Sequence, residues 1–233
     1  MSRTSAGVVW VGLALAASAL AQEPDPPREP PKALLEEIAK VSVALQLELG
    51  PELKRRGYPA PKDSLLGDDP GVLERTLTKG QVEAGTARRA AGGYRWGVLY
   101  SAQHPTNSSQ LLVTLMAARS PEAALAIKAA MLQSEEGVNR RIESEGGKVV
   151  RSETAEVKPP GATGGYACER TAVMAGKRAT LCLDKVVVTT GPWLLEVVLA
   201  GPVEVKDVKL LKAVTSAALR GLGVDTTPPP AKD

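Results

Sequence analysis

Aromatic side chains concentrate in one short segment of this chain. The sequence contains no Phe, three Trp and four Tyr, and three of these rings, Tyr94, Trp96 and Tyr100, lie between residues 94 and 101 in a pattern typical of a β-strand. Alternation along a strand puts them on one face. That face either packs beneath a helix as core or floors an apolar pocket whose hydroxyls orient a ligand. Tyr94, Trp96 and Tyr100 are therefore the candidate ligand-binding residues.

The two cysteines, Cys168 and Cys182, are candidates for a disulfide. They lie in segments 165–173 and 178–190, whose composition predicts consecutive strands. If residues 174–176 form a three-residue hairpin loop, Cys168 lies directly opposite Cys182. We therefore expect a cross-strand disulfide, an expectation that a one-residue slip of register would remove.

Few residues are arranged for catalysis. The single histidine, His104, lies in a polar turn, and as a general base it would need a nucleophile and an acid nearby. The pair Asp68-Asp69 lacks the alternating ligands of a calcium loop, and the pair Glu135-Glu136 lies on a predicted helix beside basic residues. The common nucleophile, zinc and phosphate-binding motifs are missing. The sequence therefore predicts no catalytic residue, no metal ligand and no cofactor.

The first 21 residues have the three parts of a secretory signal peptide. Arg3 precedes an apolar run, and small residues allow cleavage after Ala19 or Ala21. The run is shorter than the roughly 20 residues of a membrane-spanning helix, which favours cleavage over an uncleaved anchor. We expect an exported protein, periplasmic or secreted, without a membrane span after cleavage. An oxidising compartment of this kind also favours the disulfide.

The charge balance argues against nucleic-acid binding. The chain has 29 Lys and Arg against 26 Asp and Glu, a formal net charge of +3, and its basic runs are short. A nucleic-acid interface needs a concentrated basic surface, and base-stacking or carbohydrate platforms need repeated exposed rings. We therefore expect no nucleic-acid partner.

Composition divides the chain into five parts. Residues 22–32 are rich in proline and predict an extended linker. Residues 33–90 begin with a helix that the Gly50-Pro51 pair should end, followed by an irregular segment rich in helix breakers. The tail, residues 225–233, should be disordered. The core domain, residues 91–224, predicts two helices, 121–145 and 205–222, and strands at 94–101, 110–118, 148–157, 165–173, 178–190 and 193–200.

This order of elements predicts an α+β fold, in which a mainly antiparallel sheet of about six strands carries two or three helices on one face. A fold of this kind does not by itself give a function. The leader, the linker, the expected disulfide hairpin and the missing catalytic motifs favour an exported, non-enzymatic binding or interaction protein of the cell envelope or extracellular space. The alternatives are a carrier of a small apolar ligand in a pocket between sheet and helix, and a hydrolase. The expected partner is a protein or a small apolar ligand.

Overall fold

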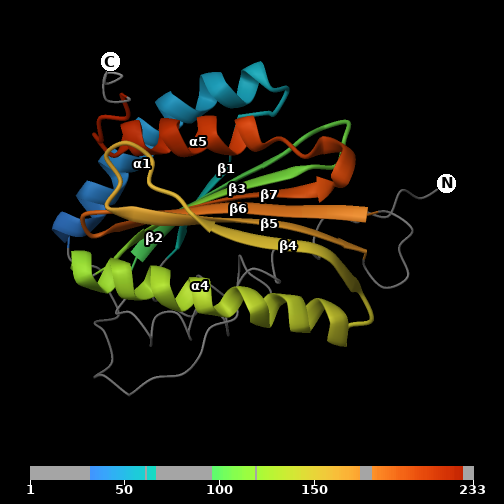
Figure 1. The fold of residues 1–233 in the computed structure, drawn as a ribbon. Helices are drawn as coiled ribbons and strands as arrows, with labels where there is room; N and C mark the ends of the chain where they lie inside the picture. The colour runs from blue at the N-terminus through green and yellow to red at the C-terminus, as the bar shows by residue number, and fades with distance from the viewer. Residues whose placement is uncertain (1–31, 61, 67–95, 119, 174–179, 228–233) are drawn as a thin grey trace, which may run out of the picture.

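An antiparallel sheet of seven strands forms the middle layer of the fold (Figure 1). The computed structural model describes residues 32–60, 62–66, 96–118, 120–173 and 180–227. The strand order is β1-β2-β3-β7-β6-β5-β4, and every neighbouring pair is antiparallel. The predicted α+β class with an antiparallel sheet is thus confirmed. The strands are β1 (Lys62–Leu66), β2 (Trp96–Gln103), β3 (Gln110–Ala117), β4 (Lys148–Glu156), β5 (Gly164–Val173), β6 (Thr180–Thr190) and β7 (Trp193–Pro202).

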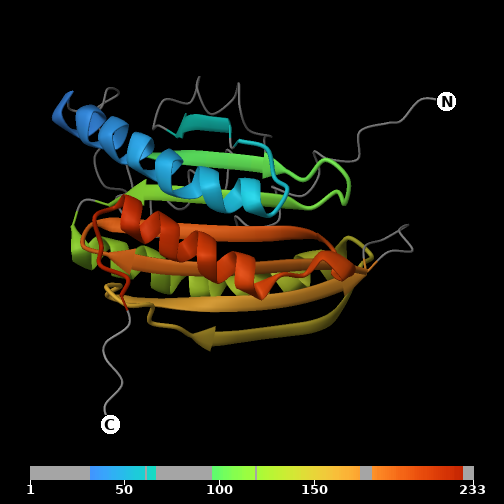
Figure 2. The same cartoon turned by 90° about the horizontal axis from the view of Figure 1, so that it is seen from above.

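Helices cover both faces of the sheet (Figures 1 and 2). Helices α1 (Lys32–Arg55) and α5 (Val208–Gly221) pack together on one face, and α4 (Pro121–Ser144) lies across the other. The expectation that all helices pack on one face is corrected here. Strands β6 and β7 are buried along almost their whole length, so both of their faces need a cover. Within the described part of the chain, no helix combines the length and apolarity needed to cross a bilayer.

Helix α4 carries the chain from one part of the sheet to the other. Strands β1, β2 and β3 are antiparallel neighbours, and α4 then leads from β3 in the middle of the sheet to β4 at its far edge. From there β4, β5, β6 and β7 return strand by strand, until β7 pairs with β3 and Leu195 lies opposite Leu115. A 3-10 turn, η2 (Val203–Val205), then leads into α5. The three central strands of the sheet, β3, β7 and β6, therefore come from both sides of α4 in the sequence.

Helix α1 continues through the Gly50-Pro51 pair, where the sequence predicts its end. Leu49 and Leu53 lie on either side of this pair and are at most 1% exposed, so core packing holds both parts of the helix in line. A proline inside a helix removes the bond to the carbonyl four residues earlier, here that of Leu47. Leu47 is 71% exposed, so this missing bond lies at a solvent-facing residue of the helix.

Side chains cap the N-termini of α4 and α5. The Oγ atom of Ser120 accepts a hydrogen bond from the Ala123 amide at 3.2 Å, which confirms the predicted start of α4. Asp207 caps α5 in the same way, accepting from the Leu210 amide at 2.9 Å. These caps fix where each helix begins over the sheet.

The two largest hydrophobic clusters lie on opposite faces of the sheet. The larger lies between the sheet and the α1–α5 pair, and its members include Leu45, Leu195 and Val214, all at most 1% exposed. The smaller lies beneath α4, where Ile127 and Met131 pack on side chains of the central strands. Helix α1 thus shares one core with the strands and with α5.

The register of β5 and β6 separates the two cysteines. Cys168 lies opposite Lys185 and Cys182 lies opposite Thr171, a shift of three positions from the predicted pairing. Because side chains alternate along a strand, an odd shift moves a residue to the other face. Cys168 faces α4, whereas Cys182 faces the side of α1 and α5, and both are buried free thiols. The predicted disulfide is therefore wrong; the predicted loop, residues 174–176, lies outside the described residues.

Both thiols are expected to be free and shielded in the purified chain. Burial raises the pKa of Cys168 and raises that of Cys182 to about 11, which keeps both groups protonated at neutral pH. A thiol reagent should label neither cysteine in the native protein and both after unfolding in urea. An intact mass, measured without reductant, that is lighter by two hydrogens would contradict the register.

Helices α1 and α5 approach each other closely at Gly221. A Cβ atom on Gly221 would lie 3.1 Å from both the Cα and the backbone nitrogen of Leu45. Gly137 in α4 provides the opposite case, because a Cβ there would meet nothing within 4 Å. The two glycines therefore form a matched pair of helix positions.

Replacing each of these glycines with alanine should change stability in opposite directions. Gly221→Ala should lower the free energy of unfolding by about 1 to 3 kcal/mol, because the helices must move apart. Gly137→Ala should raise it by roughly 0.5 to 1 kcal/mol, because alanine is the better helix former. Urea denaturation of both variants measures this difference, and a stabilising Gly221→Ala would rule out the close approach of α1 and α5.

Candidate functional site

Four charged side chains are buried between α4 and the sheet. Glu135 comes from α4, Arg170 from β5, Lys185 from β6 and Glu196 from β7, and each side chain is at most 6% exposed. Charged residues are rarely buried to this extent unless they are paired, because a lone charge loses its hydration. Here two carboxylates face two cations, so the formal charges cancel. These four residues are called the buried charge cluster below.

Helix and strand periodicity place the cluster in the interior. Glu135 lies on the buried stripe of α4, between Met131 and Val138. Lys185 and Glu196 point to the same face of their strands as the apolar residues two positions away, in segments that are otherwise rich in Val and Leu. The sequence analysis considered Glu135 as half of the Glu135-Glu136 pair but did not predict it as a site residue, and it did not single out the other three. The signal that marks them is a charged residue at a position where the pattern predicts an apolar one.

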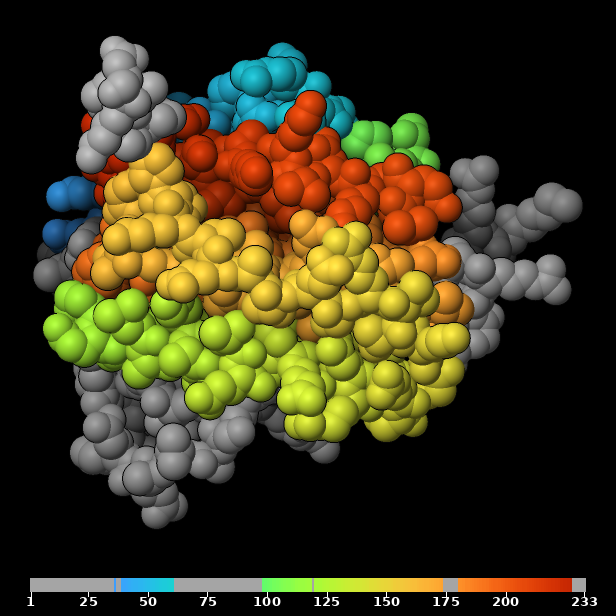
Figure 3. Space-filling view, viewed as in Figure 1, coloured from blue at the N-terminus to red at the C-terminus, as the bar shows by residue number. Residues whose placement is uncertain are grey.

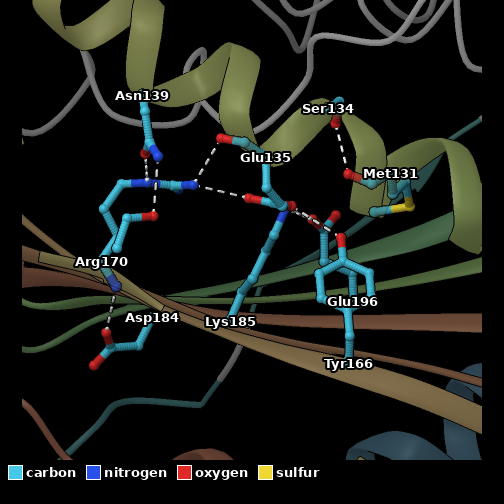
Figure 4. A network of polar contacts seen from close by, with 10 residues as sticks. Met131, Ser134, Glu135, Asn139, Tyr166, Arg170, Asp184, Lys185 and Glu196 are labelled. Atoms are coloured by element: carbon cyan, nitrogen blue, oxygen red, sulfur yellow. Dashed lines mark hydrogen bonds and ion pairs between the residues drawn. The ribbon is translucent and has the colours of Figure 1, made fainter. Parts of the chain in front are cut away.

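Glu135 is the centre of the cluster (Figure 4). Its Oε1 atom accepts a hydrogen bond from the Tyr166 hydroxyl at 2.9 Å and forms an ion pair with Lys185 Nζ. Arg170 Nη2 donates to Glu135 Oε2 at 3.0 Å and to its main-chain carbonyl at 3.1 Å. Lys185 Nζ also lies 3.5 Å from Glu196 Oε1. One helical carboxylate is thereby joined directly to β5 and β6, and through Lys185 to β7.

Arg170 extends the network to the edge of the sheet. Its Nε atom donates to Asn139 Oδ1 at 2.7 Å, and Asn139 Nδ2 donates to Ser152 Oγ on β4 at 3.0 Å. On the opposite face, the main-chain amide of Arg170 donates to Asp184 Oδ1 at 3.2 Å. The planar guanidinium group offers donors in fixed directions, which suits this role between helix and strands.

The electrostatics keep Glu135 ionised. Burial alone would raise the pKa of Glu135, but the Lys185 ammonium and the Arg170 guanidinium outweigh burial, so its pKa is lowered. Asp184 on the other face shows the reverse, because burial raises its pKa even though Lys206 Nζ lies 3.9 Å from Oδ2. These two buried carboxyls are therefore shifted in opposite directions, and the one with two close cations has the lowered pKa.

The cluster is suited to a structural role. Carboxylates beside an amine can transfer protons, but an acid or base must reach its substrate, and these side chains are closed off between α4 and the strands. In the residues that the structure describes, no three His, Cys, Asp or Glu side chains come together as metal ligands. The arrangement instead ties α4 to three strands at a fixed position and rotation.

Tyr100 is a core residue rather than part of an open surface. It is 1% exposed, packs between the sheet and the α1–α5 pair, and donates a hydrogen bond to Ser42 Oγ of α1 at 2.7 Å. Tyr94 lies outside the described residues, and Trp96 is the first residue of β2, paired with Ala117. The ligand-binding role of Tyr94, Trp96 and Tyr100 stays a prediction, and α1 occupies the position above Tyr100.

His104 has the contacts of a turn residue. Its ring packs edge-on against Tyr58 with the centroids 5.1 Å apart, and its Nδ1 atom lies 3.3 Å from both the amide and the hydroxyl of Thr106. Ser109 Oγ contacts Tyr58 and Asn107 instead of the imidazole. Across the described chain, His104 has no carboxylate as a hydrogen-bond partner. The acidic pairs do not form a site with it: Glu136 is exposed, and Asp68-Asp69 lies outside the described residues.

Comparison with known proteins gives no family for this chain. No family model matches it, and no curated protein matches it either. One similar solved structure is the crystal structure of the extracellular domain of PknH from Mycobacterium tuberculosis. It has a TM-score of 0.44 and 10% sequence identity, and the match covers 78% of this chain and 94% of that domain. A likeness this weak carries no functional argument, so function must be argued from the residues of the chain itself.

Removing Lys185 should destabilise the protein strongly. Lys185→Met removes the cation that lies between Glu135 and Glu196, and it should lower the free energy of unfolding by about 3 to 5 kcal/mol, the usual cost of breaking a buried ion pair from one side. Lys185→Met combined with Glu196→Gln restores the charge balance and should recover part of this loss. Urea denaturation of both variants measures the two effects.

The matched control is an exposed ion pair on the same helix. Arg140 and Glu136 are 72% and 80% exposed and lie 3.9 Å apart. Arg140→Met should change the free energy of unfolding by less than about 1 kcal/mol, because water screens exposed pairs. If the double variant loses as much free energy of unfolding as Lys185→Met and Glu196→Gln lose separately and added together, the two residues are not coupled.

Proposed function

We propose that this chain is an exported, non-enzymatic binding or interaction protein that acts in the cell envelope or the extracellular space. The observation that supports this proposal best is the closure of the buried charge cluster. Its acids and bases are paired with one another and hidden from solvent, so they stabilise the scaffold and do not face a substrate. A rigid scaffold whose charged side chains are buried and paired is suited to holding an outer surface in place for a binding partner.

The N-terminal sequence supports the first half of the proposal. A positive start, an apolar run and small residues before residue 22 are typical of a cleaved export signal, and the proline-rich stretch that follows is typical of an extended spacer. Export brings the folded part into contact with partners outside the cytoplasm. The proline-rich spacer would hold the folded part at a distance from the N-terminus.

Several outer surfaces are available to a partner. Leu47 on α1 is 71% exposed, Leu132 on α4 is 41% exposed, and Thr154 on β4 is also exposed. These positions lie on three different elements of the described structure. A crosslinker at each position therefore detects a partner that binds at that element.

Photo-crosslinking in the native host tests the proposal. A photoreactive amino acid is placed at Leu47, Leu132 or Thr154 of the full chain, and adducts are identified by mass after irradiation. We expect one position to give an adduct of defined mass with another molecule and the remaining positions to give none. An adduct with a second copy of this chain is recognised by its mass and does not count as support.

The matched control is the same chain without residues 2–21. It should stay in the cytoplasm and lose the adduct, while the full chain is exported and begins after Ala19 or Ala21 by intact mass. A full chain retained in the cytoplasm contradicts the export half of the proposal. An exported chain that gives no partner adduct at any of the three positions contradicts the binding half.

A further inference from the structure

Strand β4 forms an open edge of the sheet. It is nine residues long, and β5 is its sole strand partner among the described residues. Every side chain of β4 except Val149 is exposed, and Figure 3 shows this strand at the surface beside α4. An edge strand of this length presents unpaired main-chain N–H and C=O groups, which can pair with another strand.

We propose that β4 pairs with β4 of a second copy of this chain, in antiparallel orientation about a two-fold axis at Ser152. The two sheets then form one continuous sheet across a homodimer. Such an interface is symmetric, because the same residues are contributed by both copies. This self-association goes beyond the proposed binding function and does not depend on it.

The order of charges on β4 supports this partner. Arg151 and Glu153 lie one position on either side of Ser152 and have opposite signs. With the axis at Ser152, each Arg151 lies opposite Glu153 of the other copy, so two complementary pairs form. Within one chain the same two side chains already make a two-point contact, with Nε–Oε1 at 2.8 Å and Nη2–Oε2 at 2.6 Å. Four alternating charges would therefore meet around the axis.

The same charges select one register. Moving the axis to Arg151 or to Glu153 puts two like charges directly opposite each other, which destabilises a strand pair. Moving it by half a residue leaves both charges opposite uncharged residues. Charged residues normally discourage edge strands from pairing. Here they discourage most partners and registers but are complementary to the same strand of another copy.

A hydrogen bond to α4 holds strand β4 in its position at the edge of the sheet. Asn139 Nδ2 donates to Ser152 Oγ at 3.0 Å, and Asn139 is itself held by Arg170 of the buried charge cluster. The β4–β5 register is continuous from Arg151 to Glu156, and its single irregularity lies between Val149 and Arg151. The three residues at the axis, Arg151 to Glu153, therefore lie in the regular part of the strand, whereas the irregularity at Val150 falls opposite Thr154 of the other copy.

Charge reversal tests the interface by sedimentation equilibrium of the full-length chain without its leader, over a range of concentrations. We expect the wild-type protein to dimerise, and we expect Arg151→Glu and Glu153→Arg each to weaken the dimer by about tenfold or more, because two like-charge pairs then meet at the axis. The double swap, Arg151→Glu with Glu153→Arg, should restore dimerisation. An equimolar mixture of the two single variants should form a heterodimer, since all four charges are then complementary.

The control variant is Arg220→Glu, which removes an exposed pair with Glu48 (Nε–Oε2 2.8 Å) on the face of α1 and α5. It should leave the dimer unchanged. A wild-type chain that stays monomeric overturns the proposal. The open edge of β4 would then be a site for a strand of another protein. A dimer that either single reversal leaves intact, or a double swap that fails to dimerise, also overturns it. Partner adducts at Leu47 and Leu132 in the crosslinking experiment are unaffected by these outcomes, whereas Thr154 lies in the proposed dimer interface and reports on the second copy.

Discussion

The burial of β6 and β7 on both faces is the constraint on which the rest of the structure depends. These strands run through the middle of the sheet and expose almost none of their side chains, so one helical layer would leave half of their apolar surface in water. The α1–α5 pair covers one face mainly with apolar side chains, to which Tyr100 adds a hydrogen bond to Ser42. Helix α4 covers the other, where Lys185 and Glu196 require charged partners. The two layers are therefore held by different forces.

This difference affects how well each helix is positioned. Apolar packing is not directional, and a helix can slide or rotate on an apolar sheet at small cost. The contacts of Glu135 with Arg170, Lys185 and Tyr166 are directional, and they fix α4 at one axial position and one rotation. Buried polar groups of this kind can add specificity without adding net stability. The position of α4 on the sheet is therefore more strictly defined than that of the α1–α5 pair.

Sequence patterns predicted the elements but not their long-range partners. The start of α4 followed from Ser120 and Pro121, and all six predicted strands were recovered within two residues at each end because alternation and glycine-rich turns are local signals. The disulfide prediction was wrong because Val173 of β5 pairs with Thr180 of β6 and not with Lys177. This moves the register by three positions, an odd number. The charge cluster could not be assembled from sequence, since its pairing depends on which strands lie under α4.

The pairing of β7 with β3 has a consequence for how the chain folds. Strands β1 to β3 form one local unit, and β4 to β7 form another, but the two units join only when Leu195 meets Leu115. Closing so long a loop has an entropic cost before any contact repays it, and non-local pairing of this kind slows folding. The last strand to be synthesised is thus the one that completes the middle of the sheet. Until then both units expose an unpaired apolar edge, and a chain that stops short of residue 193 has no single sheet to fold into.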